Sequence, residues 1–147
     1  MAESGRPLGG RTYLADSSAW AHAHHSQVRD EWSAALRAGQ IATGPIVKLE
    51  LLYSARDGAH FDQLEADLAQ LRDVPITRSV TNLALAAFRD LAQVGPLHHR
   101  SVSLPDLLIA ASAQDTALGV LHYDEDFDVL AGLLGFESRW IAPRGSL

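Results

Sequence analysis

The chain has 147 residues, enough for one domain, with 18 acidic and 12 basic residues, a formal charge of −6 and no cysteine. The lack of cysteine excludes disulfides, thiol catalysis and cysteine-ligated metals. A composition of 47% hydrophobic and 20% charged residues excludes wholesale disorder. No run of about 18 apolar residues is free of charge, and the first residues are polar and glycine-rich, so we expect a cytoplasmic domain with no membrane partner.

The acidic balance bears on nucleic-acid binding. A protein that binds nucleic acid by long-range electrostatics alone is usually basic, whereas the pI of this chain is about 5.5. Either the chain does not bind nucleic acid, or a bound divalent cation neutralises part of its acidic surface.

Short β-like runs alternate with longer stretches of helical spacing. Residues 1–11 predict a mobile leader and residues 143–147 a mobile tail, because both are short and rich in glycine or proline. Between them we expect, in chain order, strand 12–15, a helix from Ser17 or Ser18 to about 24, helix 28–38, strand 40–43, helix 45–55, helix 61–71, strand 74–76, helix 79–94, loop 95–102, helix 103–118, strand 120–123, helix 126–134 and strand 136–141.

Strands separated by helices require right-handed crossovers and give a parallel sheet that is covered on both faces. The sequence therefore predicts an α/β protein. We expect one three-layer α/β/α domain over residues 12–142, built on a mostly parallel sheet of four to five strands.

Three acidic residues fall where such a sheet places its ligand-binding edge, at the carboxyl ends of the strands. Asp16 directly follows the first expected strand, and Asp124 follows the fourth. Asp106 lies in the first turn of the helix before that fourth strand. This helix runs about 20 Å away from the edge, and the strand returns in the opposite direction. We therefore expect all three carboxylates at one edge.

Glu50 is a fourth candidate. Its helix is apolar on nearly every side, and Glu50 shares a face with Ile46 and Tyr53, so we expect it to point inward or into a cleft. Lys48, the only lysine, projects elsewhere, and clustered carboxylates repel one another unless a cation lies among them. Oxygen ligands favour Mg²⁺ or Mn²⁺, and such a site predicts phosphodiester hydrolysis by a metal-activated water.

The carboxylates also have structural explanations. Asp106 follows Ser103 by three residues, close to a capping-box arrangement, and Asp16 is placed to begin a turn. Asp124 and Asp126 both stand where a strand gives way to a helix. We assign Asp126 as the helix cap, which leaves Asp124 for the site.

The histidines predict surface rather than a metal site. His22, His24 and His25 form a dense group, but a helix end of this kind is more often solvated, and no zinc-binding spacing such as H-E-x-x-H occurs. The segment from His98 to Arg100 is expected to be loop surface. No phosphate-binding loop or serine-hydrolase elbow is present.

Four acid-bearing segments follow one another along the chain: Tyr-Leu-Ala-Asp16-Ser-Ser18, Thr43-Gly-Pro-Ile-Val-Lys-Leu-Glu50, Leu-Pro-Asp106-Leu-Leu-Ile-Ala-Ala and Leu-His-Tyr-Asp124-Glu-Asp126-Phe-Asp. Their order and spacing, within about residues 12–141, resemble those of PIN-domain ribonucleases. More narrowly, the pattern is similar to that of the VapC-type toxins of bacterial toxin–antitoxin pairs.

The resemblance implies a PIN-like fold and a metal-dependent endoribonuclease whose acidic site holds Mg²⁺, with Mn²⁺ able to substitute. Matched by motif, Asp126 is an auxiliary metal ligand or helix cap, and Ser18 is a hydrogen bonder behind the site. The expected catalytic and metal-binding residues are Asp16, Glu50, Asp106 and Asp124.

The resemblance further implies a homodimer, a cognate antitoxin that binds near the active site, and structured RNA, such as transfer or ribosomal RNA, as substrate. One departure from the family pattern stands out. Many relatives carry Thr or Ser two residues before the fourth acid, where this chain has His122. This change is expected to alter substrate contacts or the positioning of water.

Three alternatives stay open at this point. A phosphatase or a DNA-cleaving nuclease would use the same acidic edge. A receiver-like signalling module also binds Mg²⁺ at strand ends, although it needs a lysine after its last strand, where this chain has Arg139. A catalytically silent PIN-like domain would only bind a partner.

Overall fold

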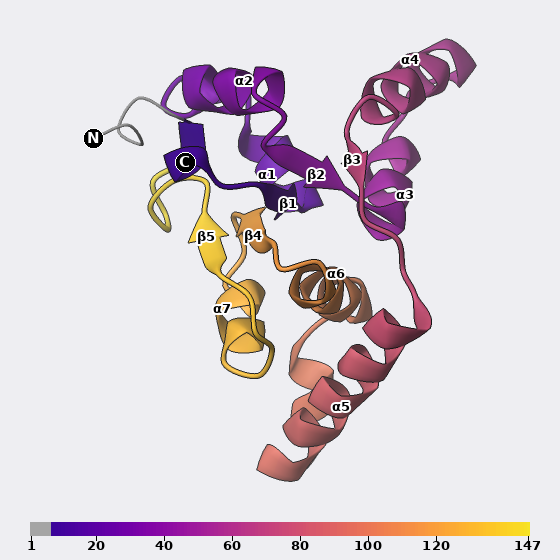
Figure 1. Cartoon of the computed structure of the whole chain (residues 1–147), viewed down its shortest axis with the longest axis vertical. Coiled ribbons are helices and arrows are strands. Elements are labelled where there is room, and N and C mark those ends of the chain that lie inside the picture. Colours follow the sequence, from indigo (N-terminus) through magenta and orange to yellow (C-terminus); the bar gives the residue numbers. More distant parts are fainter. Residues whose placement is uncertain (1–6) are drawn as a thin grey trace.

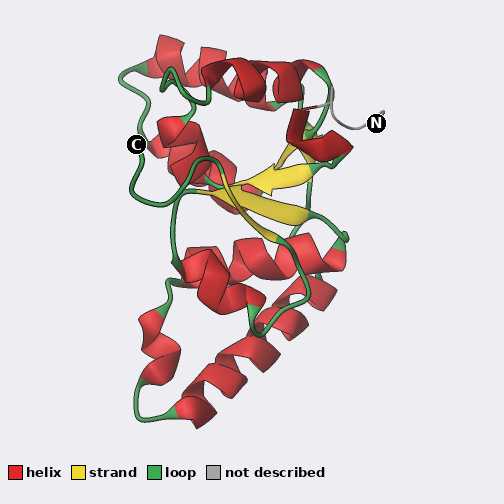
Figure 2. Ribbon diagram, turned by 90° about the vertical axis from the view of Figure 1, so that its left-hand side faces the viewer, coloured by secondary structure: helices red, strands yellow, loops and turns green. Residues whose placement is uncertain are grey.

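The computed structural model describes residues 7–147 and places a five-stranded sheet between two layers of helices (Figure 1, Figure 2). The strands are β1 Tyr13–Ala15, β2 Ile41–Thr43, β3 Arg72–Asp73, β4 Gly119–His122 and β5 Ser138–Trp140. The α-helices are α1 Ser17–His22, α2 Arg29–Arg37, α3 Pro45–Tyr53, α4 Gly58–Leu68, α5 Arg78–Val94, α6 Leu104–Asp115 and α7 Asp126–Ala131. Two short 3-10 helices are η2 Pro7–Gly10 and η3 His98–Ser101. The three-layer α/β/α prediction is confirmed.

All neighbouring strands are parallel, in the order β3-β2-β1-β4-β5. The chain proceeds outward from β1 to β3 and then returns to the other side of β1 as β4, so the direction of winding reverses between β1 and β4. Open α/β sheets bind ligands at such a switch point, outside the carboxyl ends of the strands. The order also excludes the receiver-like alternative, because that fold has the order 2-1-3-4-5.

Each face of the sheet has its own hydrophobic core, because successive strand residues point to opposite faces. On one face, Tyr13 and Leu121 pack with residues of α1 and α2. On the other, Leu14 and Val120 pack with residues of α5, α6 and α7. Figure 2 shows the strands between these helices. The short strands are therefore held by burial on both sides, which leaves their carboxyl ends free to carry polar groups.

The strand predicted at 74–76 lies instead at Arg72–Asp73. The N–H of Val74 still bonds to the carbonyl of Thr43 at 2.7 Å, but the Val74 side chain is buried in the core beyond the end of the strand. The apolar signal in this segment therefore reflects core packing rather than strand pairing.

Helix starts follow side-chain caps that the hydrophobic pattern does not show. The helix predicted from 61 begins at Gly58, because the Asp57 carboxylate accepts the N–H of His60 at 2.8 Å. The first helix is capped by Asp16 rather than by Ser17 or Ser18, and it ends at His22 instead of about 24. The segment 95–102, predicted as a loop, contains η3.

The predicted leader and tail both contact the domain. Residues 1–6 lie outside the described residues, but Leu8 is buried and its N–H donates to Glu31. In the tail, the Leu147 N–H donates to the Tyr123 hydroxyl at 2.9 Å, and Arg144 forms an ion pair with Glu125. The packed region therefore extends beyond residues 12–142 at both ends. In the part of the chain described, none of the helices has the length and apolarity needed to cross a membrane.

Candidate active site

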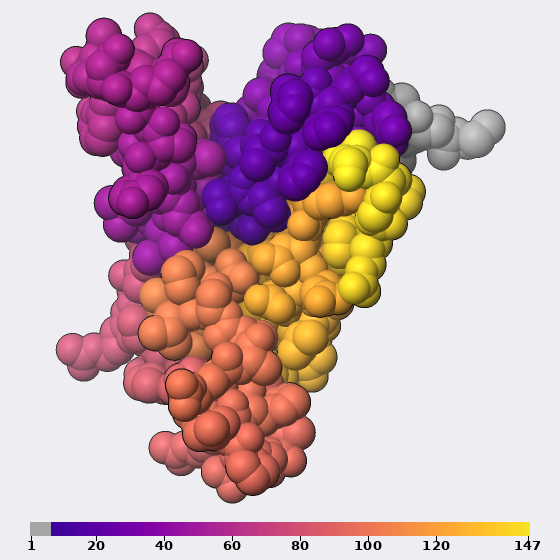
Figure 3. Space-filling model, turned by 180° about the vertical axis from the view of Figure 1, so that it is seen from behind, coloured from indigo at the N-terminus to yellow at the C-terminus, as the bar shows by residue number. Residues whose placement is uncertain are grey.

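An open cleft of about 800 Å³ lies at the carboxyl ends of β1 and β4, at the switch point of the sheet. It is lined by α1, by α3 and α4, by the first turn of α6, and by the segment after β4. Figure 3 shows the α3–α4 arm and the α1 segment facing each other across a hollow. The cleft brings together all five acidic residues expected from the sequence: Asp16, Glu50, Asp106, Asp124 and Asp126.

The tightest acidic group of the described residues consists of Asp106, Asp124 and Asp126. Each offers one carboxylate oxygen, and the three oxygens lie within 4.8 Å of one another. Such oxygens are the ligands that Mg²⁺ and Mn²⁺ prefer. Asp16 and Glu50 line the same cleft outside this trio. The donor set therefore fits a hard divalent cation.

Asp16 is buried, and its Oδ1 is fully engaged. Oδ1 accepts from the Ser18 hydroxyl at 2.7 Å and from the Ala19 N–H at 3.2 Å, so the same carboxylate caps α1. Burial raises the pKa of Asp16 to about 7, although the hydrogen bonds from Ser18 and Ala19 act to lower it. Repulsion from Asp106 adds to the rise. Asp16 therefore lies in an environment that disfavours its negative charge unless a cation is present.

Asp106 sits in the first turn of α6, where the Ser103 hydroxyl accepts its backbone N–H at 3.2 Å. Burial raises the pKa of Asp106 to about 6, with further contributions from Asp124, Asp126 and Glu50. The N-cap of α6 is therefore Ser103, through its hydroxyl, and only the backbone N–H of Asp106 takes part in this cap bond.

Glu50 lines the cleft from α3 and is exposed, so of the two expected positions, inward or into a cleft, it takes the second. Desolvation still raises the pKa of Glu50, although a hydrogen bond from Ser17 opposes the rise. Lys48 pairs with Asp73 at 2.7 Å, on the other side of the helix turn. Glu50 is therefore left for the cleft.

The turn after β4 corrects the assignment of the helix cap. Asp124 Oδ1 accepts the N–H of Asp126 at 3.0 Å, while the N-cap residue of α7, Glu125, makes no side-chain cap bond. The prediction that Asp126 is the cap is wrong, because the side chain of Asp124 reaches the first N–H of the helix. The carboxylate of Asp126 instead lies beside those of Asp106 and Asp124. Desolvation raises the pKa of Asp126, and the negative charges of Asp124 and Glu125 raise it further.

Ser18 links two of the acidic segments. Its hydroxyl donates to Asp16 Oδ1 and accepts the N–H of Tyr123 at 2.8 Å. The end of β1 and the end of β4 are therefore joined by one side chain in the wall of the cleft, and Ser18 makes hydrogen bonds there as the resemblance implied.

The histidines are only partly the solvated surface that the sequence predicted. His24 is exposed, but His22 is half-buried, lines the cleft, and places its ring centroid 4.3 Å from that of Tyr123. In the segment predicted as loop surface, His99 packs edge-on against Phe88. His60 also lines the cleft from α4, which no local sequence signal indicated.

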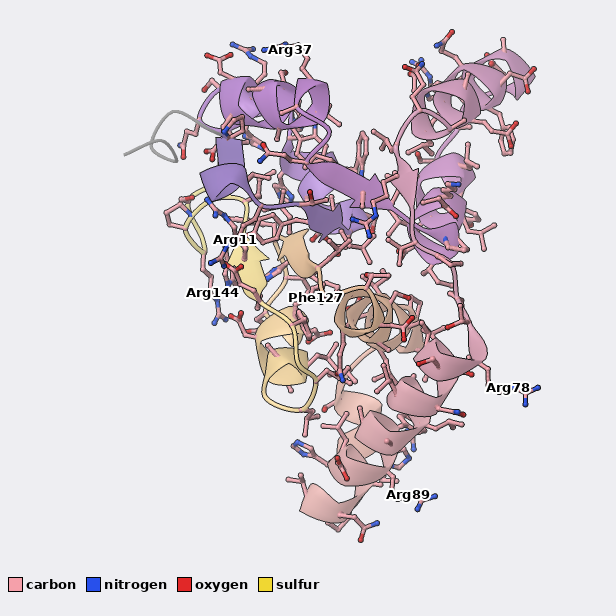
Figure 4. All side chains as sticks on the ribbon, viewed as in Figure 1. Arg11, Arg37, Arg78, Arg89, Phe127 and Arg144 are labelled. Atoms are coloured by element: carbon pink, nitrogen blue, oxygen red, sulfur yellow. The ribbon has the colours of Figure 1, made fainter. Side chains whose placement is uncertain are left out.

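His122 lies beneath the cleft and is fully buried. Burial lowers its pKa to about 4. Its ring lies beside those of Trp140 and Phe127, and the latter is labelled in Figure 4 between α7 and α6. The buried His122 side chain therefore cannot contact a substrate directly, which leaves an indirect effect through the residues around it.

The sequence model of the PIN domain matches residues 13–133. The chain belongs to the PIN-domain family. Within the family it is 42% identical to Ribonuclease VapC18 of Mycobacterium tuberculosis, over 92% of this chain and 98% of that protein. It therefore belongs to the VapC branch of PIN-domain proteins.

Solved structures agree with this assignment. The VapBC-5 toxin–antitoxin structure of M. tuberculosis has a chain that matches with a TM-score of 0.62 and 25% identity, over 88% of this chain and 98% of that chain. A chain of the DNA-bound VapBC structure of Salmonella typhimurium matches with a TM-score of 0.68 over 90% and 99%, and its 16% identity shows a shared fold. The acidic cleft thus lies in a PIN-domain fold.

Proposed function

We propose that this PIN-domain protein is a metal-dependent endoribonuclease, the toxin of a toxin–antitoxin pair, which hydrolyses RNA phosphodiesters with a metal-activated water. The observation that carries the proposal is the trio of carboxylate oxygens within 4.8 Å at the switch point of the sheet. The ribonuclease relatives support RNA as the substrate.

The acidic residues of the cleft would have different roles in this reaction. Asp106, Asp124 and Asp126 would hold Mg²⁺, or Mn²⁺ in its place, with Asp16 completing the negative charge from the end of β1. The bound cation would supply positive charge that acidifies water and stabilises the charge that develops on phosphate. Glu50, on the opposite wall, would orient the attacking water and accept its proton. Because the described residues that line the cleft include no arginine or lysine, the cation would also offset the repulsion between the carboxylates and an entering RNA phosphate.

The partners follow from the relatives. We expect a cognate antitoxin protein as partner, which the match to a chain of a VapBC toxin–antitoxin structure supports, and the family resemblance implies that it binds near the cleft. Structured RNA such as transfer or ribosomal RNA would be the substrate, and we expect the protein to act on it in the cytoplasm. A homodimer is supported by large apolar side chains that α3 exposes: Leu49 is 67% exposed and Tyr53 93%.

The test is cleavage of total bacterial RNA by the purified protein with Mg²⁺ or Mn²⁺, compared with EDTA. We expect discrete cuts that require metal and fall at least 100-fold in Asp16→Asn, because oriented charge in the site is lost. Asp90→Asn, which changes an exposed carboxylate on α5 away from the cleft, is the matched control and should cleave like the wild type.

Equal cutting by Asp16→Asn and the wild type would contradict the catalytic assignment. A protein that cuts nothing with either metal, yet still binds a partner, would be the catalytically silent domain. Matched DNA and RNA strands distinguish the remaining alternative, since a DNA-cleaving nuclease would prefer the DNA strand.

A further inference from the structure

His122 is the last residue of β4 and forms a hydrogen bond within its own turn. The backbone N–H of Asp124 donates to His122 Nδ1 at 3.1 Å. Serine, threonine and asparagine side chains commonly close such i to i+2 turns through an oxygen. Here a histidine ring nitrogen has that role, and the N–H it receives belongs to a residue of the acidic trio.

The partners of the ring determine its protonation. A backbone N–H can only donate, so Nδ1 carries no proton, and the neutral ring has its proton on Nε2. Nε2 lies 2.7 Å from the Ser138 hydroxyl and donates to it. Ser138 then donates to Asp128 Oδ1 at 2.6 Å, and Asp128 Oδ2 accepts from Trp140 Nε1 at 2.9 Å. Every group in this series has a partner of the right kind.

This series anchors the Asp124 turn to β5 and α7. Two successive N–H groups of the turn are held by side chains, that of Tyr123 by Ser18 and that of Asp124 by His122. Asp124 Oδ1 in turn holds the N–H of Asp126. A shift in the His122 contact would therefore move both Asp124 and Asp126, two of the three carboxylates.

We propose that His122 is a positioning residue: its Nδ1 holds Asp124, and through it Asp126, in the arrangement that binds a divalent cation. The ring acts from beneath the cleft and touches neither substrate nor cation. The inference rests on the proposed metal site, but not on the identity of the substrate.

The test compares His122→Thr with His122→Val in the full-length protein. The two replacements have nearly the same shape and leave the same cavity, but only threonine offers an oxygen to the N–H two residues on. Both variants lose the contact to Ser138 and the same ring volume, so thermal unfolding of both measures this shared loss and checks that each variant is folded.

The affinity for Mn²⁺, measured by calorimetry on metal-free protein, should separate the two variants. Loss of a partner that orients a ligand typically weakens metal binding about 10- to 100-fold. We expect that loss in His122→Val and a clearly smaller loss in His122→Thr. Equal affinity of the two variants would overturn the proposal, even if both still cleave RNA.

A second measurement needs no substitution. The ¹⁵N shifts of the wild-type ring in metal-free protein report which nitrogen carries the proton, and we expect Nε2–H with a slowly exchanging Asp124 amide. A proton on Nδ1 would overturn the proposal. The two proposals can fail separately. If the variants differ in Mn²⁺ affinity as expected but the wild-type protein cleaves no RNA, the positioning role is supported and the proposed function is contradicted.

Discussion

At the scale of single residues, the same carboxylate can cap a helix and also belong to the acidic site. Asp16 caps α1 through Oδ1 and still lines the cleft, and Asp124 holds the first N–H of α7 while it belongs to the acidic trio. A carboxylate has two oxygens with several acceptor positions. A structural explanation for such a residue therefore does not compete with a functional one.

The raised pKa values predict how stability depends on pH in metal-free protein. The folded state holds the protons of Asp16, with a pKa of about 7, and Asp106, with a pKa of about 6, more tightly than the unfolded chain does. Their stabilising effect is thus complete below about pH 4 and is lost as the pH rises through 6 and 7. In EDTA, Asp16→Asn should be more stable than the wild type at pH 8, by about 1–3 kcal/mol.

Urea unfolding at pH 5 and pH 8 measures this effect. Asparagine keeps an oxygen that caps α1, so the helix start is preserved in the variant. The advantage of Asp16→Asn should shrink at pH 5, where the wild-type carboxyl is protonated. A variant that is less stable than the wild type at pH 8 would show that the Asp16 charge is not destabilising.

At the scale of elements, three- and four-residue strands place the site because β1 and β4 are neighbours in register. Leu14 pairs with Val120 and Ala15 with Leu121. Asp16 and the Asp124 turn therefore leave the sheet side by side. α6 runs antiparallel to the β4 that it precedes, which returns its first turn, with Asp106, to the same edge.

The close approach at the start of β4 predicts a sharp glycine requirement. A Cβ on Gly119 would lie 2.7 Å from the buried ring of Tyr13 and 2.9 Å from the Glu137 carbonyl oxygen. Gly119→Ala should lower the free energy of unfolding by about 1–3 kcal/mol, because both neighbours are held by the sheet. Gly58→Ala, which meets nothing within 4 Å at the start of α4, is the control and should change it by less than about 0.5 kcal/mol.

Chemical denaturation of the three proteins, with metal present throughout, gives the comparison. If Gly119→Ala were as stable as the wild type, the approach of β1 and β4 that places the acidic residues would be looser than the structure shows.

At the scale of the whole molecule, the charge distribution leaves the cleft strongly acidic. The formal charge is −6, and the described residues that line the cleft include no arginine or lysine. Figure 4 shows Arg37, Arg78 and Arg89 pointing outward from α2 and α5, which do not line the cleft. Under the proposed function, a bound cation would therefore be the main source of positive charge for this surface.

Metal binding should accordingly stabilise the fold. A ligand that binds only the folded state adds about 2.7 kcal/mol at a concentration of 100 Kd, so Mn²⁺ should raise Tm at pH 7.5. Asp106→Asn should lose most of this increase, since one of three ligands becomes neutral. Differential scanning calorimetry in sodium chloride of matched ionic strength controls for screening, and an equal increase in the variant would contradict a specific site.

The sequence by itself determined the layered α/β architecture and the five acidic candidates, because alternating apolar periods and the residues that follow each strand are local signals. The tertiary structure decided what depends on distant contacts. It shifted β3 to Arg72–Asp73, since Val74 is apolar for the core rather than for pairing. It also showed that the Asp124 carboxylate accepts the first N–H of α7. The hydrogen-bond partners of the buried His122 come from β5 and α7, which lie further along the chain, so no local pattern around His122 could show them.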